Sequence, residues 1–172
     1  MMTAEQASSK IYTQARAGTA VNPGLPPTLA YLLVAQAKHE TGNFTSKFFK
    51  QYNNAFGYSY VSGGKYQTGS GTIADNGQPI AVYPDIESST KEVIDWINRR
   101  QKEGKFPANL ETITTPETYA QLLKASGYYG DTLSNYLKGL KNFFSYNIPA
   151  ASIGGGLLLL TAAAILWYVW RK

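Results

Sequence analysis

A lone glutamate at the end of an apolar helical segment is the feature that most constrains this chain. Between residues 28 and 42 apolar side chains recur at helical spacing, while Gln36 and Glu40 lie four positions apart on a neighbouring face. Gly42 is expected to end the helix, because glycine readily adopts the left-handed conformation of a C-cap. The Glu40 carboxyl is then expected at the opening of a cleft, with apolar neighbours on one side. Such surroundings raise the pKa of a carboxyl toward neutrality, so the pattern predicts a general acid.

Four sequence blocks include or follow Glu40. Residues 35–42 read AQAKHETG, residues 53–57 read NNAFG, residues 81–97 read AVYPDIESSTKEVIDWI, and residues 119–140 read YAQLLKASGYYGDTLSNYLKGL. Together they resemble the FlgJ-type peptidoglycan hydrolases. The pattern of that family runs AQ-x-x-x-E-[ST]-G, N-N-x-F-G, an aromatic strand with a Ser-led helix, then Y-x-x-x-L-x-x-A-G-Y-x-x-D and N-Y-x-x-x-L. Each block alone is weak evidence, but the four occur in the family's order over about 110 residues.

The resemblance implies an endo-β-N-acetylglucosaminidase that cuts peptidoglycan glycan strands and needs no cofactor. It implies an α+β fold, a mainly helical lysozyme-like domain with a small antiparallel β lobe, which we place at residues 1–146. Glu40 corresponds to the family's catalytic glutamate. Tyr128 corresponds to the tyrosine of the A-G-Y block, which faces that glutamate in such enzymes.

The second catalytic group is the least defined part of this prediction. Family members often carry a glutamate in the β lobe before an N-G turn, whereas residues 71–77 here read GTIADNG. Asp75 is the nearest acid and is a candidate base or nucleophile, although an Asp-Asn-Gly turn explains it equally well. Without a second acid, the substrate's acetamido oxygen or the muramyl 6-hydroxyl, as in lytic transglycosylases, could attack the anomeric carbon.

Amide and aromatic side chains near Glu40 suit an N-acetyl sugar. We expect substrate contacts from Asn53, Asn54, Tyr58, Tyr66 and Tyr83, while a simple turn at the two asparagines is the alternative.

His39 is the only histidine, and the chain has no cysteine. One imidazole without a thiol cannot make a zinc site, so no metal is predicted. His39 points about 100 degrees away from Glu40 around the helix and is expected at the surface or in packing.

Local patterns predict the other elements. Helices are expected over residues 3–17, from a cap at Thr28 to Gly42, from Ser88 or Ser89 to about Gly104, and over residues 116–125 and 133–144. Alternating aromatics and glycines over residues 55–83 predict two or three short strands, with turns at residues 63–64 and 76–77.

A 23-residue uncharged stretch, IPAASIGGGLLLLTAAAILWYVW, occupies residues 148–170. As a helix it spans roughly 34 Å, enough for a bilayer core of about 30 Å. Trp167, Tyr168 and Trp170 before the basic Arg171 and Lys172 are typical of a membrane interface. The stretch predicts a single-pass C-terminal transmembrane helix, and therefore a lipid membrane as a partner.

Charge and the N-terminal residues bear on location. The 16 basic and 11 acidic residues are scattered without a basic stripe, so no nucleic-acid partner is predicted. Residues 1–18 lack the continuous apolar region of a secretory signal. A bacteriophage virion protein, with other virion proteins and a viral membrane as partners, is one hypothesis. A bacterial tail-anchored enzyme is the rival.

The sequence therefore predicts a membrane-anchored peptidoglycan glycosidase used for wall penetration or lysis. A lytic transglycosylase and a non-catalytic wall-binding or structural virion module on the same fold are the alternatives.

Overall fold

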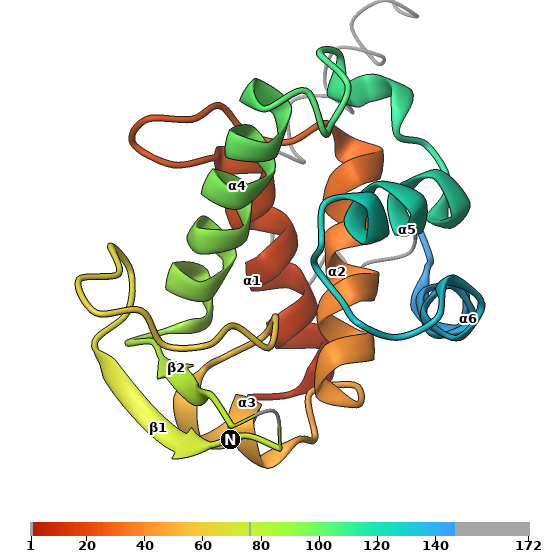
Figure 1. Ribbon diagram of the computed structural model, residues 1–172. Coiled ribbons are helices and arrows are strands. Elements are labelled where there is room, and N and C mark those ends of the chain that lie inside the picture. Colours follow the sequence, from red (N-terminus) through yellow and green to blue (C-terminus); the bar gives the residue numbers. More distant parts are fainter. Residues whose placement is uncertain (1, 76, 147–172) are drawn as a thin grey trace, which may run out of the picture.

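The computed structural model describes residues 2–75 and 77–146, which form a mainly helical domain with one small β hairpin (Figure 1). This confirms the α+β prediction. The elements in chain order are α1 (Ala4–Ala17), α2 (Pro27–Thr41), α3 (Lys47–Tyr52), β1 (Gly69–Ile73), β2 (Pro79–Val82), α4 (Ile86–Lys102), the short 3₁₀ helix η1 (Leu110–Thr112), α5 (Pro116–Ala125) and α6 (Leu133–Phe143).

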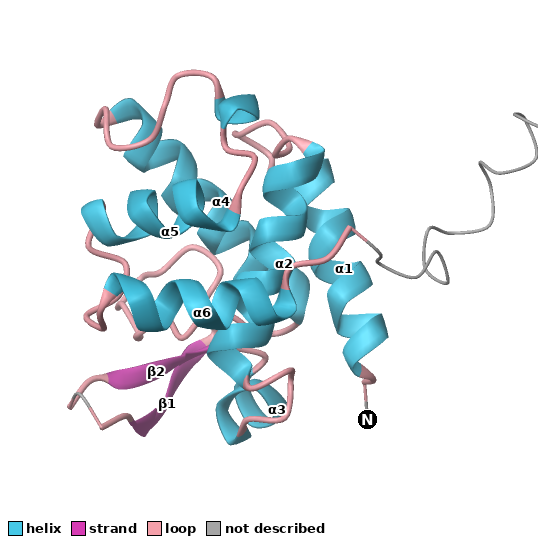
Figure 2. Cartoon of the chain, turned by 90° about the vertical axis from the view of Figure 1, so that its right-hand side faces the viewer, coloured by secondary structure: helices cyan, strands magenta, loops and turns pink. Residues whose placement is uncertain are grey.

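Helix α2 is the centre of the domain. It packs against α1 on one side and against α6 on the other, while α4 covers α1 and α5 lies on α6 (Figures 1 and 2). Its apolar residues are almost completely buried, as Leu29, Leu32 and Leu33 illustrate. Because the helix is surrounded by other helices, its position is fixed along its length, and so is the position of its last turn.

Polar N-caps start most of the helices. Thr3 and Gln6 form a reciprocal capping box at α1, and Asp85, Thr115 and Thr132 accept backbone N–H groups at α4, α5 and α6. The expected cap at Thr28 is wrong, because α2 begins at Pro27 with no side-chain cap. Likewise α4 begins before Ser88, since Asp85 accepts the Ser88 N–H and starts the helix earlier.

The β lobe is a single antiparallel hairpin of β1 and β2, with an irregular register between Ser70 and Ile73. An isolated bridge joins Ser59 to Ile80, so the loop before β1 also lies along β2. In Figure 1 the hairpin projects beside α3 at the end of the domain where α2 finishes. The expected two or three strands are therefore two strands with one bridge.

Within residues 2–75 and 77–146, no helix is both long and apolar enough to cross a membrane. The predicted transmembrane helix at residues 148–170 lies outside the described residues.

Candidate active site

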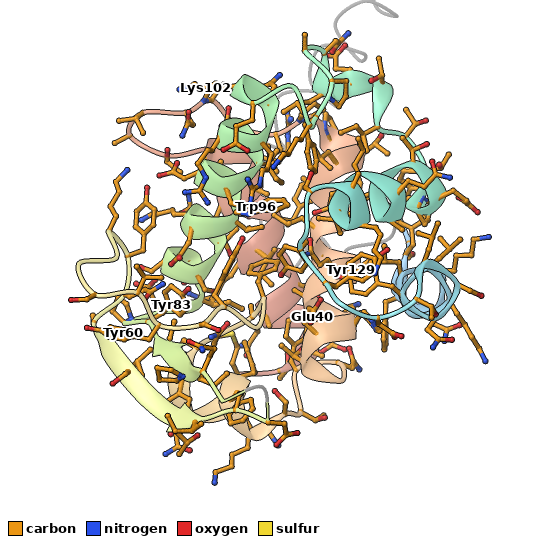
Figure 3. All side chains as sticks on the ribbon, viewed as in Figure 1. Glu40, Tyr60, Tyr83, Trp96, Lys102 and Tyr129 are labelled. Carbon is orange, nitrogen blue, oxygen red and sulfur yellow. The ribbon has the colours of Figure 1, made fainter. Side chains whose placement is uncertain are left out.

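A cleft of about 870 Å³ lies at the C-terminal end of α2. Its walls come from α2, the segment 56–66, α4, the α5–α6 connection and α6. Figure 3 shows Glu40 at the lower end of α2, with Trp96 towards α4 and Tyr129 towards α6. All three residues line the cleft.

Glu40 stands on the last turn of α2. Gly42 ends the helix as predicted, in a left-handed conformation with φ 56°. The hydroxyl of Tyr136 donates a hydrogen bond of 2.6 Å to Oε1 of Glu40. Gly57 approaches the other oxygen, because a Cβ added there would lie 3.5 Å from Oε2. The carboxyl is thus held between α6 and the segment after α3.

Burial raises the pKa of Glu40 to about 7, and the hydrogen bond from Tyr136 opposes this rise only in part. The groups around the carboxyl are phenols. Burial raises the pKa of Tyr58, Tyr119, Tyr128 and Tyr136, and the nearby Glu40 carboxylate adds to each rise. None of these phenols carries a positive charge that would stabilise the carboxylate strongly, so a substantial fraction of Glu40 is protonated near neutral pH.

Tyr128 lines the cleft, but its hydroxyl does not bond to Glu40. It donates a hydrogen bond of 2.5 Å to the carbonyl of Phe56, and its ring makes edge-on contacts with Trp96 and Tyr58. The phenol that bonds to Glu40 is Tyr136. In the sequence, the N-Y-x-x-x-L block that contains Tyr136 served only to indicate the family, and Tyr136 was not predicted as a partner of Glu40.

The predicted substrate-binding asparagines hold the backbone instead. Asn53 ends α3 with φ 52° and donates to the carbonyls of Tyr83 and Pro84 at 3.1 and 3.2 Å. Asn54 is buried, donates to the carbonyls of Tyr58 and Ala81, and accepts the N–H of Tyr58. Neither asparagine lines the cleft, so this placement agrees with the turn interpretation.

The three predicted tyrosines divide between the cleft and the core. Tyr58 and Tyr66 line the cleft. Tyr83 is only 2% exposed and lies behind the wall, where its hydroxyl donates to Glu92 at 2.7 Å. This corrects the expectation that Tyr83 faces the substrate, because its side chain, directly after strand β2, lies in the interior and bonds to Glu92.

Asp75 lies exposed in the turn between β1 and β2, outside the set of cleft-lining residues. The structure therefore does not bring Asp75 to Glu40 as a second acid. The acids that share the cleft with Glu40 are Glu92 and Asp95 of α4 and Asp131 of the α5–α6 connection. Sequence reasoning missed them, since a carboxylate on a helix is usually a solvated surface group.

The two acids of α4 that line the cleft, Glu92 and Asp95, fasten its rim. Gln67 donates its side-chain amide to Glu92 at 2.8 Å. The hydroxyl of Tyr66 and the ammonium of Lys65 reach Oδ2 of Asp95 at 2.8 and 3.1 Å. The segment before β1 is thereby fixed to α4.

In the part of the chain that the structure describes, no group of three or more acidic, histidine or cysteine side chains could hold a metal ion.

A buried carboxyl with a pKa raised to about 7, in an open cleft, is the form in which glycoside hydrolases hold their general acid. The family model described as mannosyl-glycoprotein endo-beta-N-acetylglucosaminidase matches residues 25–148, and the chain belongs to this glucosaminidase family. The prediction of a glycoside hydrolase acting on peptidoglycan is thereby confirmed.

Two solved structures share the fold. The C-terminally truncated glycoside hydrolase domain of FlgJ from Salmonella typhimurium superposes with a TM-score of 0.54 at 22% identity, covering 82% of this chain and 95% of that chain. A chain of a type VI secretion system effector–immunity complex from Pseudomonas protegens gives 0.51 at 15% identity, covering 82% and 93%. Comparison with curated proteins gives no significant match.

Proposed function

We propose that this protein is an endo-β-N-acetylglucosaminidase that cuts the glycan backbone of peptidoglycan, with Glu40 as the general acid. The observation that carries the proposal is the Glu40 carboxyl itself. It lines an open cleft, accepts a hydrogen bond from Tyr136, and has a pKa raised to about 7 by burial. A carboxyl in this state can donate a proton to a glycosidic oxygen at neutral pH.

The proposed reaction needs one protein carboxyl. Protonated Glu40 gives its proton to the leaving oxygen while the C1–O bond breaks. The acetamido oxygen of the same N-acetylglucosamine attacks C1, which forms a cyclic oxazolinium ion. The Glu40 carboxylate then takes a proton from a water molecule as that water opens the ring. This route suits a cleft whose other acids are already hydrogen-bonded: Glu92 and Asp95 to the rim segment, and Asp131 to the start of α6.

Digestion of purified peptidoglycan, followed by mass spectrometry of the new chain ends, tests the proposal. Reducing N-acetylglucosamine ends are expected. Ends carrying 1,6-anhydromuramic acid would instead identify a lytic transglycosylase. A folded protein that releases no product, with wall binding retained, would identify a binding module.

We also propose that residues 148–170 attach the enzyme to a membrane, on the basis of their uncharged composition. Full-length protein should float with liposomes and resist extraction by high salt or alkali, because ions do not screen apolar burial. Protein ending at residue 146 should stay in solution and still cut peptidoglycan. Aggregation of the shortened protein would instead make the segment part of the domain core.

We further propose that the protein is located in a virion. The support is the combination of a wall-cutting domain with a predicted membrane anchor in one chain. Labelling the protein in purified phage particles, with and without lipid extraction, would test it. A signal confined to bacterial membranes would favour the tail-anchored bacterial enzyme.

A further inference from the structure

Helices α2 and α6 make an unusually close contact beside the active site, at His39 and Gly139. A Cβ atom added to Gly139 would lie 2.2 Å from Nδ1 and 2.3 Å from Cε1 of His39. Such distances leave no room for any side chain at position 139. The imidazole ring of His39 therefore occupies the notch that glycine leaves in α6.

This contact lies next to the bond between Tyr136 and Glu40. His39 and Glu40 are consecutive on α2, and Tyr136 and Gly139 are one helical turn apart on α6. The neighbouring pairs thus meet across one interface. His39 fills the notch, while Glu40 accepts the hydroxyl of Tyr136 at 2.6 Å.

The ring of Tyr136 is held between two other rings. His39 contacts it edge-on, with centroids 4.8 Å apart and an interplanar angle of 87°. Tyr129 stacks on it with centroids 3.7 Å apart and an angle of 4°. These contacts fix the direction in which the Tyr136 hydroxyl points, and that direction decides whether it reaches Glu40.

We propose that His39 is a positioning residue of this glycosidase: its ring, seated against Gly139, holds Tyr136 in the orientation that donates to the Glu40 carboxyl. The proposal rests on the proposed role of Glu40 as the acid. It gives the lone histidine a part in the reaction through packing, with no proton transfer of its own.

The surrounding charges agree with a packing role. Burial lowers the pKa of His39, and nearby Asp131 opposes this only in part, so its surroundings favour the neutral ring. The groups facing Glu40 are the phenols of Tyr119 from α5, Tyr128 from the α5–α6 connection, Tyr136 from α6 and Tyr58 from the segment after α3. Among these, the Tyr136 hydrogen bond is the contact that lowers the pKa of Glu40.

His39→Ala tests the proposal in full-length protein. Without the ring, Tyr136 can rotate away from Glu40, so we expect kcat to fall roughly tenfold, as misplacement of a catalytic contact does. The basic limb of the pH–rate profile should move to higher pH, because the contact that lowers the pKa of Glu40 is weakened. A ¹³C NMR titration of the Glu40 carboxyl should move in the same direction, which provides a readout that does not depend on turnover.

His39→Phe separates ring shape from ionisation. A flat apolar ring can fill the same notch, so this variant should regain both kcat and the pH profile of the wild type. If only the ionisable imidazole restores them, His39 acts through its charge and the proposal is overturned.

Gly139→Ala probes the same contact from α6. The added methyl must displace the imidazole, so the single variant should lose stability and show the same shift of the pH profile. In His39→Ala/Gly139→Ala the methyl has room, and stability should return while the pH profile stays shifted. Gly69→Ala is the matched control, since no atom lies within 4 Å of a Cβ at Gly69.

One result rejects the proposal without touching the proposed function. If His39→Ala lowers the melting temperature but leaves kcat, the pH profile and the carboxyl titration unchanged, His39 is merely structural. Full activity in Glu40→Gln would instead reject the proposed function.

Discussion

The two walls of the cleft treat their carboxyl groups in opposite ways. On the α2–α6 wall, Glu40 is buried among phenols, and its pKa rises to about 7. On the α4 wall, burial of Asp95 would also raise its pKa, but hydrogen bonds from Asn22, Tyr66, Lys65 and Thr19 lower it overall. Asp95 is less deeply buried than Glu40 and accepts more hydrogen bonds, so both differences favour its charged form, while Glu40 keeps its proton to higher pH.

Glu92 combines features of both walls, because its carboxyl accepts hydrogen bonds and yet its pKa is raised. It lies on α4, one turn before Asp95. Burial raises the pKa of Glu92, although hydrogen bonds from Tyr83 and Gln67 and the charge of Arg99 oppose the rise. The cleft acids of α4 therefore have in common that they accept hydrogen bonds from the rim segment, whereas Glu40 on the α2–α6 wall can exchange its proton with a substrate.

The strongest test of this division is Glu40→Gln. Glutamine keeps the size of the side chain and can still accept from Tyr136, but it has no proton to transfer. Because general acid catalysis contributes about 10²- to 10⁴-fold, turnover of peptidoglycan should fall by that range. Retention of more than about a tenth of wild-type turnover would remove Glu40 from the acid role.

The same variant has a predicted effect on stability. The folded-state pKa of Glu40 is raised from 4.5 to about 7, so the folded protein holds this proton more tightly than the unfolded chain. The contribution of Glu40 to the free energy of unfolding is complete below the unfolded pKa and is lost as pH rises through about 7. As the pH rises from about 4 to about 8, the stability of Glu40→Gln relative to the wild type should therefore increase. Thermal melts of both proteins at the two pH values measure this change.

Tyr136→Phe should have the next largest effect. It removes the hydroxyl that donates to Glu40 and keeps the ring between His39 and Tyr129. A hydrogen bond to a charged group contributes about 1.5 kcal/mol or more, so kcat should fall about tenfold. The basic limb of the pH profile should also move up, since the bond lowers the pKa of Glu40. Tyr60→Phe, outside the cleft lining, is the control.

Asp95→Asn addresses the other wall and should act on binding. Asparagine has one acceptor oxygen where Asp95 uses two, so it cannot keep the bonds at both Oδ1 and Oδ2, and it loses the ion pair with Lys65. Loss of one ordinary hydrogen bond, about 1 kcal/mol, should raise KM about fivefold and leave kcat unchanged. In the wild type, the bonds from Tyr66 and Lys65 to Asp95 should weaken as the pH falls through the lowered pKa of Asp95.

Glu87→Gln provides a matched substitution on α4 outside the cleft lining. It should change neither kinetic constant. A fall in kcat for Asp95→Asn, with KM unchanged, would show that the α4 wall takes part in the chemical step. That result would contradict the assignment of this wall to binding alone.

Local signals explain which parts of the fold the sequence could predict. The bounds of α5 were predicted correctly, because Thr115 and Pro116 form an unambiguous start. The start of α4 was wrong by a few residues, since Asp85, Ser88 and Ser89 are all suitable caps. Helix α3 was missed because its six residues are too short to show a periodicity.

The sequence could predict a site residue only where the local pattern around that residue was sufficient to identify it. Glu40 stands at a recognisable helix end. Its partner Tyr136 lies 96 positions away, and a pattern along the chain cannot show which of several tyrosines reaches across. The acids of α4 were overlooked for the same reason, because the side of a helix that faces a cleft depends on what packs against its other sides.

Asp75→Asn should have the smallest effect. It tests whether the β hairpin also contributes a carboxylate to the cleft. Asp75 is exposed in the β1–β2 turn, and asparagine also favours turns, so activity and melting temperature should stay close to those of the wild type. The measurement is kcat/KM on peptidoglycan together with a melting curve. A loss as large as that of Glu40→Gln, with an unchanged melting curve, would mean that the hairpin closes over the substrate and supplies a second carboxylate. The one-carboxyl route through the acetamido oxygen would then have to give way to a two-carboxylate mechanism.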